Sequence, residues 1–178
     1  QKIKKSNWQR HTFCNPKDKT LMKLSNNNEL DILYSNEIKN TEIIMRDLWY
    51  QINNYIKNLN FPWFDGWNGY THIRYNKYIE NKKMALHCDH IHSIFDGERK
   101  GIPILSCLGV LNDDYEGGEF QIEKWCAPHV RKRHRTILKA KGVGTVLVFP
   151  SFLHHRVKPV IKGNRYSLVC WFRGPQFR

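Results

Sequence analysis

The sequence feature that most constrains the fold is a succession of short apolar or alternating runs that fills the chain after Gly69. About eight such runs follow one another, and Gly, Pro, Asn or Asp residues separate many of them. Runs of this length with turn residues between them indicate a β-sandwich or a jelly roll and argue against alternating strands and helices. The runs cover residues 71–75, 84–89, 102–111, 118–125, 136–141, 145–149, 157–161 and 166–172.

One helix is predicted before this β-rich part. Over residues 41–59 the apolar residues recur at the spacing of a single helical stripe, and Asn40 or Thr41 is suited to cap its start. We expect the helix to pack on the outside of a sheet. The 178 residues are predicted to form a single domain, in which residues 1–69 support a mainly β core over residues 70–178.

Two histidines and one aspartate have the arrangement of a metal site. His87 and Asp89 are two residues apart on a predicted strand, so their side chains point to the same side while Cys88 points away. His155 lies far downstream and supplies a second imidazole. Two imidazoles and one carboxylate on one face of an iron leave coordination positions open for substrates, which is the facial triad of non-haem Fe(II) oxygenases.

Two alternatives at this motif stay open on the residues alone. His90 and His92 extend the motif and suggest a zinc cluster, although neighbouring residues of a strand face opposite sides and one metal does not collect them all. His154 competes with His155, because adjacent strand residues also point to opposite faces.

Charge is segregated along the chain. Residues 1–123 hold all 16 acidic residues and 16 of the 29 lysines and arginines, while residues 124–178 hold 13 basic residues and no acid. Residues 131–135 are the densest part of this basic third. Such a third is typical of a surface that binds nucleic acid or an acidic peptide, and a solvated basic face is the plainer interpretation.

Nothing in the sequence points to a membrane or to an oxidising compartment. No apolar run approaches the ~20 residues of a membrane-spanning helix, and no apolar segment follows the charged start at residues 1–5, so we expect no signal peptide. The five cysteines are odd in number and form no CxxC pair, which favours a reducing compartment. We therefore expect a cytoplasmic protein without a membrane partner.

With the triad placed on strands, the chain resembles the Fe(II)/2-oxoglutarate-dependent dioxygenases, most closely their prolyl 4-hydroxylase-like branch. The likeness covers roughly residues 71–175, and an ordered set of motifs carries it. These motifs are Arg74-Tyr75, His87-Cys88-Asp89, Gly109-Val110-Leu111-Asn112, Glu116-Gly117-Gly118-Glu119-Phe120, Val148-Phe149-Pro150-Ser151, His155-Arg156-Val157-Lys158-Pro159-Val160 and Gly163-Asn164-Arg165-Tyr166-Ser167-Leu168.

The resemblance implies a mainly β fold, the double-stranded β-helix (a cupin-like jelly roll), with iron at its open end. It implies that His87, Asp89 and His155 ligate Fe(II), with 2-oxoglutarate and O2 as cosubstrates and ascorbate as a reductant. Arg165 would bind the far carboxylate of 2-oxoglutarate, where a guanidinium offers a bidentate pair that lysine does not copy.

The resemblance assigns two further residues to the cosubstrate. Ser167, on the same strand face as Arg165, matches the family's Arg-x-Ser pairing, and Tyr75 stands where the family often places a tyrosine. Oxygen-sensing prolyl hydroxylases carry a tyrosine at the position of Val110, and Ser167 is the candidate substitute for its hydrogen bond.

The implied reaction is hydroxylation of a peptide or protein substrate, with proline as the expected residue and succinate and CO2 as products. One alternative is an oxygenase acting on nucleic acid or on a free metabolite. Against nucleic acid, the demethylase branch carries a second arginine six residues after the first, whereas Arg165 and Arg173 are eight apart. A second alternative is a non-catalytic basic jelly-roll binding protein.

Overall fold

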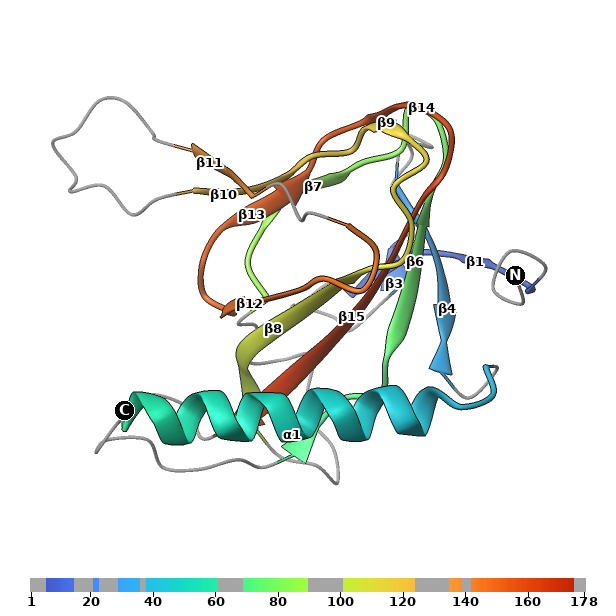
Figure 1. The fold of residues 1–178 in the computed structure, drawn as a ribbon. Helices are drawn as coiled ribbons and strands as arrows, with labels where there is room; N and C mark the ends of the chain where they lie inside the picture. The colour runs from blue at the N-terminus through green and yellow to red at the C-terminus, as the bar shows by residue number, and fades with distance from the viewer. Residues whose placement is uncertain are drawn as a thin grey trace, which may run out of the picture.

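The computed structural model describes residues 6–14, 21–22, 29–35, 38–60, 69–89, 101–123, 135–138 and 142–174. Strands dominate the described part, and one long helix lies across the outside of a sheet (Figure 1). The prediction of a mainly β fold with an N-terminal helix outside a sheet is therefore confirmed. In the same part of the chain, no helix is both long enough and apolar enough to cross a membrane.

The elements follow one another along the chain in this order. They are β1 (Gln9–Arg10), β2 (Phe13–Cys14), β3 (Leu21–Met22), β4 (Asp31–Tyr34), α1 (Thr41–Leu59), β5 (Gly69–Tyr70), β6 (Arg74–Tyr78), β7 (Met84–His87), β8 (Ile102–Val110), β9 (Glu116–Gly117), β10 (Phe120–Glu123), β11 (Arg135–Leu138), β12 (Val146–Pro150), β13 (His155–Val157), β14 (Val160–Lys162) and β15 (Arg165–Gly174).

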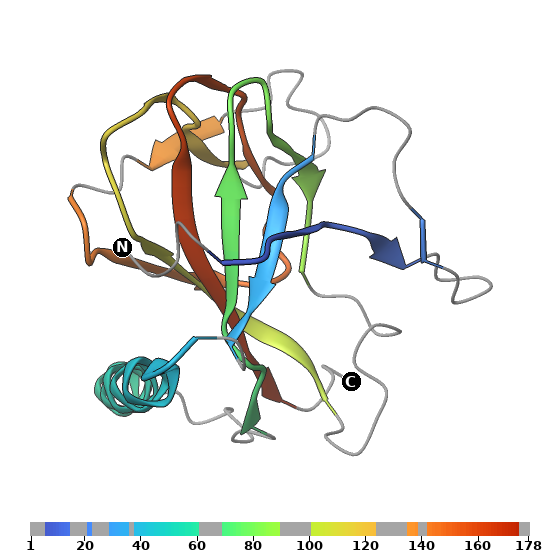
Figure 2. The same cartoon turned by 90° about the vertical axis from the view of Figure 1, so that its right-hand side faces the viewer.

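Two antiparallel sheets form the framework. The major sheet has the order β1-β4-β6-β15-β8-β12, with β5 added beside β15, and the minor sheet has the order β11-β10-β13-β7. Neighbours in both sheets are mostly distant in sequence: β15 lies between β6 and β8, and β13 lies between β10 and β7. The helix lies on the other side of the major sheet from the minor sheet (Figures 1 and 2).

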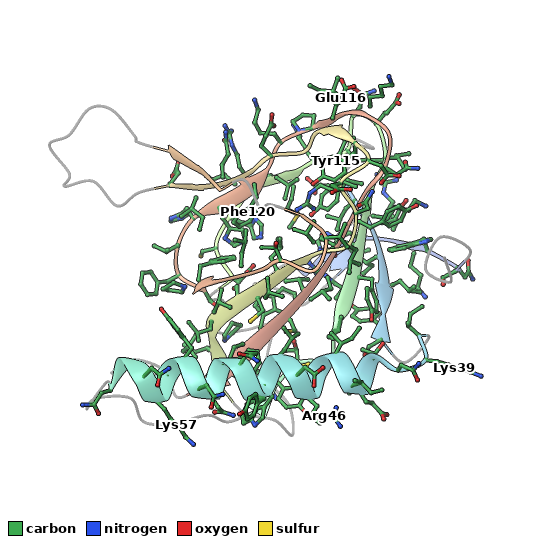
Figure 3. All side chains as sticks on the ribbon, in the orientation of Figure 1. Lys39, Arg46, Lys57, Tyr115, Glu116 and Phe120 are labelled. Atoms are coloured by element: carbon green, nitrogen blue, oxygen red, sulfur yellow. The ribbon has the colours of Figure 1, made fainter. Side chains whose placement is uncertain are left out.

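The outer core lies between α1 and the major sheet. One stripe of the helix is buried there, because apolar residues at helical spacing share one face: Met45, Leu48 and Ile52 pack in one cluster with Leu168 and Phe172 of β15. The opposite face of the helix is solvated, and the labelled lysine and arginine side chains of α1 point away from the sheets (Figure 3).

The inner core lies between the two sheets. Phe120 of the minor sheet and Phe149 of the major sheet meet there with ring centroids 5.3 Å apart. Tyr78, Leu108 and Val160 belong to the same buried cluster. Because the two sheets pack through this cluster, the inward-facing residues of β6, β8 and β15 are brought opposite those of β7 and β13.

Two predicted strands differ from the observed ones. The strand predicted at residues 71–75 is observed three residues later, as Arg74–Tyr78. Lys77 interrupts the apolar pattern from which the prediction was made, and yet it pairs with Tyr166 in the ladder. Its ammonium lies 3.6 Å from the Asp31 carboxylate. The run predicted at residues 157–161 is divided into β13 and β14, since Pro159 between them has no N–H for a ladder.

Candidate functional site

Three side chains from the minor sheet and its edge converge on one point. His87 ends β7, Asp89 follows two residues later, and His155 begins β13, where it is the direct cross-strand partner of His87. His87 Nε2 lies 3.2 Å from Asp89 Oδ1, and His155 Nε2 lies 3.5 Å from Asp89 Oδ2. One ligand atom from each residue lies within 4.8 Å of the others, so the three can hold one metal ion.

Backbone carbonyls orient both imidazoles. The Nδ1 of His87 lies 2.8 Å from the carbonyl oxygen of Ala85, and the Nδ1 of His155 lies 3.0 Å from that of Leu153. A carbonyl oxygen only accepts, so each Nδ1 carries the proton and donates it. Each Nε2 therefore keeps its lone pair and faces Asp89, which is the tautomer that a metal ligand needs.

Two serines hold Asp89 in place. The hydroxyl of Ser106, on β8, donates to Asp89 Oδ2 at 2.7 Å and also lies 2.9 Å from the hydroxyl of Ser151. The backbone N–H of Asp89 donates to the carbonyl oxygen of Ser151 at 2.9 Å. Asp89 is thus fixed by both its backbone and its side chain, although it lies beyond the end of β7.

The protonation states favour metal binding. Burial acts to raise the pKa of Asp89, but the neighbouring His87 and His155 imidazoles and the hydrogen bond from Ser106 outweigh it, so the pKa lies below its ordinary value. Burial lowers the pKa of His155, and the Asp89 carboxylate opposes this only in part. At neutral pH the site therefore offers an ionised carboxylate and a neutral His155.

The donor set fits Fe(II). Imidazole nitrogen and carboxylate oxygen ligands bind metal at about 2.1 Å, so adjacent ligands are about 3 Å apart, close to the separations seen here. Two histidines and one carboxylate with open positions are the set that non-haem Fe(II) oxygenases use, whereas structural zinc sites are closed by four ligands. Within the described ranges, these three residues are the one such group.

The structure distinguishes the neighbouring histidines. His155 is 5% exposed and joins the cluster, while His154 points into solvent. Cys88 is a free thiol outside the cluster. His90 and His92, on which the zinc alternative rests, lie outside the described residues.

Arg165 lies on the inner face of the major sheet, at the first position of β15. It is 3% exposed, its Nη1 donates to the Ser167 hydroxyl at 3.1 Å, and its guanidinium carbon lies 5.1 Å from the centroid of the Tyr78 ring. Among the described residues it makes no ion pair. A buried guanidinium without an anion is costly, so this place suits the carboxylate of a ligand.

Asn112 positions the turn that leads into Arg165. Its amide nitrogen donates to the carbonyl oxygen of Asn164 at 2.7 Å, and its amide oxygen accepts from the N–H of Tyr166 at 2.6 Å. The flanking peptide groups of Arg165 are therefore held by one side chain, which follows the end of β8. Gly118 packs closely against the side chain of Arg165. It has a φ of +63°, and a Cβ at this position would lie 2.9 Å from Cδ of Arg165.

Tyr75 does not reach this site, which corrects its predicted role at the cosubstrate. It faces α1 in the outer core, where its hydroxyl lies 3.0 Å from the Thr41 hydroxyl. Because alternate residues of β6 face opposite sides, Tyr78 takes the inward position beside Arg165.

Sequence reasoning missed Tyr78 and Ser106. Extending the predicted strand by three residues would have found Tyr78, since residues 74, 76 and 78 share one face. No sequence signal marks Ser106, because its partner Asp89 is brought to it only by the packing of the two sheets. The side chains of residues 131–135, the basic run, lie outside those that the structure describes.

Solved structures share this arrangement of strands. An oxidoreductase of the 2OG-Fe(II) oxygenase family from Burkholderia pseudomallei matches with a TM-score of 0.61 at 17% identity, over 96% of this chain and 74% of that chain. A prolyl hydroxylase from Trichoplax adhaerens, in complex with a hypoxia inducible factor peptide fragment, matches with a TM-score of 0.61 at 16% identity, over 96% of this chain and 72% of that chain. These likenesses confirm the predicted jelly roll.

Sequence comparison identifies the family. A PKHD-type hydroxylase of Idiomarina loihiensis is 31% identical over 99 residues, which are 56% of this chain and 40% of the relative, so the match spans about two fifths of that protein's length. The family model described as the 2OG-Fe(II) oxygenase superfamily matches residues 73–173, which include the three clustered residues and Arg165. The chain therefore belongs to the 2OG-Fe(II) oxygenase superfamily.

Proposed function

We propose that the protein hydroxylates a peptidyl substrate, with proline as the target residue, and releases succinate and CO2. The observation that carries the oxidising part of this proposal is the pairing of two features on facing sheets: the His87, Asp89 and His155 cluster, and the buried Arg165 that has no ion pair among the described residues.

Fe(II), 2-oxoglutarate and O2 are the cofactor and cosubstrates of this superfamily. Bound together, they supply oxidation of an unactivated C–H bond coupled to decarboxylation of 2-oxoglutarate. His87, Asp89 and His155 hold the metal through two nitrogens and one oxygen. Their hydrogen bonds to the backbone and to Ser106 keep these atoms in place in the absence of metal.

Arg165 binds the carboxylate of 2-oxoglutarate that is remote from the metal. Its contact with the Ser167 hydroxyl and its position over the Tyr78 ring fix the plane of the guanidinium, so few conformations are lost when the carboxylate binds. The Ser167 hydroxyl accepts from Arg165 in the structure and keeps its own proton to donate to the ligand.

The choice of a peptidyl proline rests on similarity. The Trichoplax adhaerens structure holds a peptide fragment, and a further solved match is a prolyl-4-hydroxylase from Pseudomonas putida, with a TM-score of 0.58 at 16% identity. Fold similarity alone does not select a substrate. The proposal for this chain therefore needs its own substrate test.

The first experiment tests the chemistry of the site. Succinate formation from 2-oxoglutarate is measured with Fe(II) and ascorbate for wild type, His87→Ala and Arg165→Ala, and Fe(II) binding is measured in parallel. We expect His87→Ala to lose iron binding and turnover, and Arg165→Ala to bind iron but to need far more 2-oxoglutarate. The exposed Arg46→Ala on α1 is the matched control and behaves as wild type.

A second experiment tests the substrate. Proline-containing peptides, free amino acids and single-stranded oligonucleotides are compared for stimulation of succinate formation and for a mass increase of one oxygen atom. Peptide hydroxylation supports the proposal, and stimulation by an oligonucleotide or a free amino acid alone contradicts the peptidyl part. Absence of iron binding together with absence of turnover would instead favour a binding protein without catalysis.

A further inference from the structure

A second arginine faces the space between the sheets and has no role in the site described above. Arg74 is the first residue of β6 and lies on the same face as Tyr78, the last residue of that strand. It is half-buried, and its guanidinium carbon lies 4.9 Å from the centroid of the Trp171 ring. A guanidinium on an indole face at this distance is a cation–π pair, and the indole sets the plane of the charged group.

Two hydrogen bonds fix the guanidinium of Arg74 further. Its Nε donates to Asn76 Oδ1 at 3.1 Å, and its Nη1 donates to Nε2 of His11 at 3.3 Å. Burial, with Arg74 and His87 nearby, lowers the pKa of His11 to about 3, so this imidazole is neutral and accepts. The remaining N–H groups of Arg74 have no partner among the described residues, and no carboxylate there forms an ion pair with it.

Arg74 lies at the opposite end of β6 from the strand position that pairs with Arg165, the arginine proposed for 2-oxoglutarate. In the ladder between β6 and β15, Tyr78 is opposite Arg165 and Arg74 is opposite Val169. The two ends of a five-residue strand are about 13 Å apart at about 3.3 Å per residue. Arg165 is assigned to 2-oxoglutarate, so Arg74 is left for another ligand.

Arg74 lies at the iron end of this face. Its neighbour Trp171 is the cross-strand partner of Ser106, which donates to Asp89. Burial lowers the pKa of Arg74, and the charge of Asp89 is close enough to oppose this. A preorganised cation with free N–H groups is therefore next to the metal ligands, where a substrate must be oxidised.

We propose that Arg74 is a specificity-determining residue: it binds a carboxylate that the oxidised substrate carries close to its reacting carbon. This rests on the proposed function and deepens it, since it makes the peptidyl substrate an acidic one. The planar guanidinium fork matches a carboxylate in two parallel hydrogen bonds. The exposed part of Trp171 offers an apolar wall for the carbon atoms beside that carboxylate.

The carboxylate has two chemical sources, and the experiment distinguishes them. One is an acidic side chain next to the target residue of a peptide, and the other is the α-carboxylate of a C-terminal residue or a free amino acid. Matched ligand pairs differ only in this group: a proline peptide with Glu or Gln at each flanking position, a peptide ending in proline or prolinamide, and free proline or prolinamide.

Binding is measured by calorimetry under anoxia, with Fe(II) and 2-oxoglutarate present. We expect wild type to bind the acidic member of at least one pair about 10- to 100-fold more tightly than the amide, as a buried charge-assisted pair does. Arg74→Gln removes this preference and leaves the affinity for 2-oxoglutarate unchanged. Lys77→Gln, three residues further along the same strand and on its opposite face, keeps the preference.

Arg74→Lys is the second variant in case the glutamine variant does not fold. It keeps the charge and loses the fork, so the preference is reduced and not removed. The proposal is wrong if wild type binds no acid more tightly than its amide, or if either Arg74 variant keeps the full preference. A preference for acids confined to free amino acids supports the role of Arg74 and contradicts the peptidyl substrate, so the two proposals fail separately.

Discussion

The hydroxyl of Ser106 donates a hydrogen bond of 2.7 Å to the carboxylate of Asp89, across the gap between the two sheets. Ser106 belongs to the major sheet, and Asp89 follows the last strand of the minor sheet in its order. The hydrogen bond therefore ties the metal cluster to the sheet that carries Arg165. The geometry of the cluster and the position of Arg165, the proposed cosubstrate arginine, are coupled through it.

Replacing Ser106 by alanine should weaken metal binding. Asp89 loses a charge-assisted hydrogen bond that helps to orient its carboxylate, and loss of such a partner costs about 10- to 100-fold in metal affinity. Anoxic titration with Fe(II) measures the change. Ser167→Ala on the same sheet is the control, since it contacts Arg165 and should raise the KM for 2-oxoglutarate with iron affinity unchanged. Equal iron affinity in wild type and Ser106→Ala would contradict the coupling.

Replacing His154 and His155 one at a time by alanine should show which of these adjacent histidines binds iron. His155→Ala removes a buried group whose Nε2 faces Asp89, and we expect loss of iron binding and of turnover. His154→Ala removes an exposed side chain and leaves iron binding as in wild type. Iron content after anoxic reconstitution is the measurement. Full iron binding by His155→Ala would contradict the assignment of His155 as the third metal ligand.

Leucine in place of Tyr78 or Tyr75 should give different defects. Tyr78→Leu removes the ring beneath Arg165, a contact worth about 0.5–2 kcal/mol, and we expect the KM for 2-oxoglutarate to rise about 2- to 30-fold. Tyr75→Leu loses its hydroxyl contact with Thr41 and packing against α1, so Tm falls while KM is unchanged. Thermal unfolding and 2-oxoglutarate saturation curves test both variants. A KM that rises for Tyr75→Leu and not for Tyr78→Leu would show that Tyr75, and not Tyr78, supports Arg165.

The stability of the metal-free protein should fall in acid partly through His11. Its pKa is lowered from 6.5 to about 3 by burial, with Arg74 and His87 nearby. Between these values the unfolded state binds more protons than the folded state, so stability decreases as the pH falls. The contribution is at most about 1.4 kcal/mol per pH unit.

His11→Gln tests this, because its amide oxygen accepts from Arg74 without titrating. Urea unfolding at pH 7, 6 and 5 should show a shallower loss of stability for His11→Gln than for wild type. The same change at the exposed His72 keeps the wild-type slope. Parallel slopes for wild type and His11→Gln would show that His11 does not contribute.

Local patterns in the sequence were sufficient to propose the metal ligands and the cosubstrate arginine. His87 and Asp89 are two apart, and so are Arg165 and Ser167, and a strand places such pairs on one face whatever surrounds them. The helix over residues 41–59 follows in the same way from its apolar stripe, and its predicted bounds agree with α1. For the iron ligands, local patterns left open only the choice between His154 and His155, and the family resemblance indicated His155.

Long-range packing sets which face of each strand contacts which neighbouring element. The family resemblance assigned Tyr75 to the site, whereas the observed pairing of β6 with β15 brings Tyr78 beside Arg165 and turns Tyr75 to the helix. Ser106 and Arg74 reach the iron end only because two sheets made of sequence-distant strands pack face to face. Ligand type and spacing are local, so the sequence alone was enough to propose the oxidising chemistry. The surroundings of the candidate iron site are set by long-range packing, which no local pattern encodes.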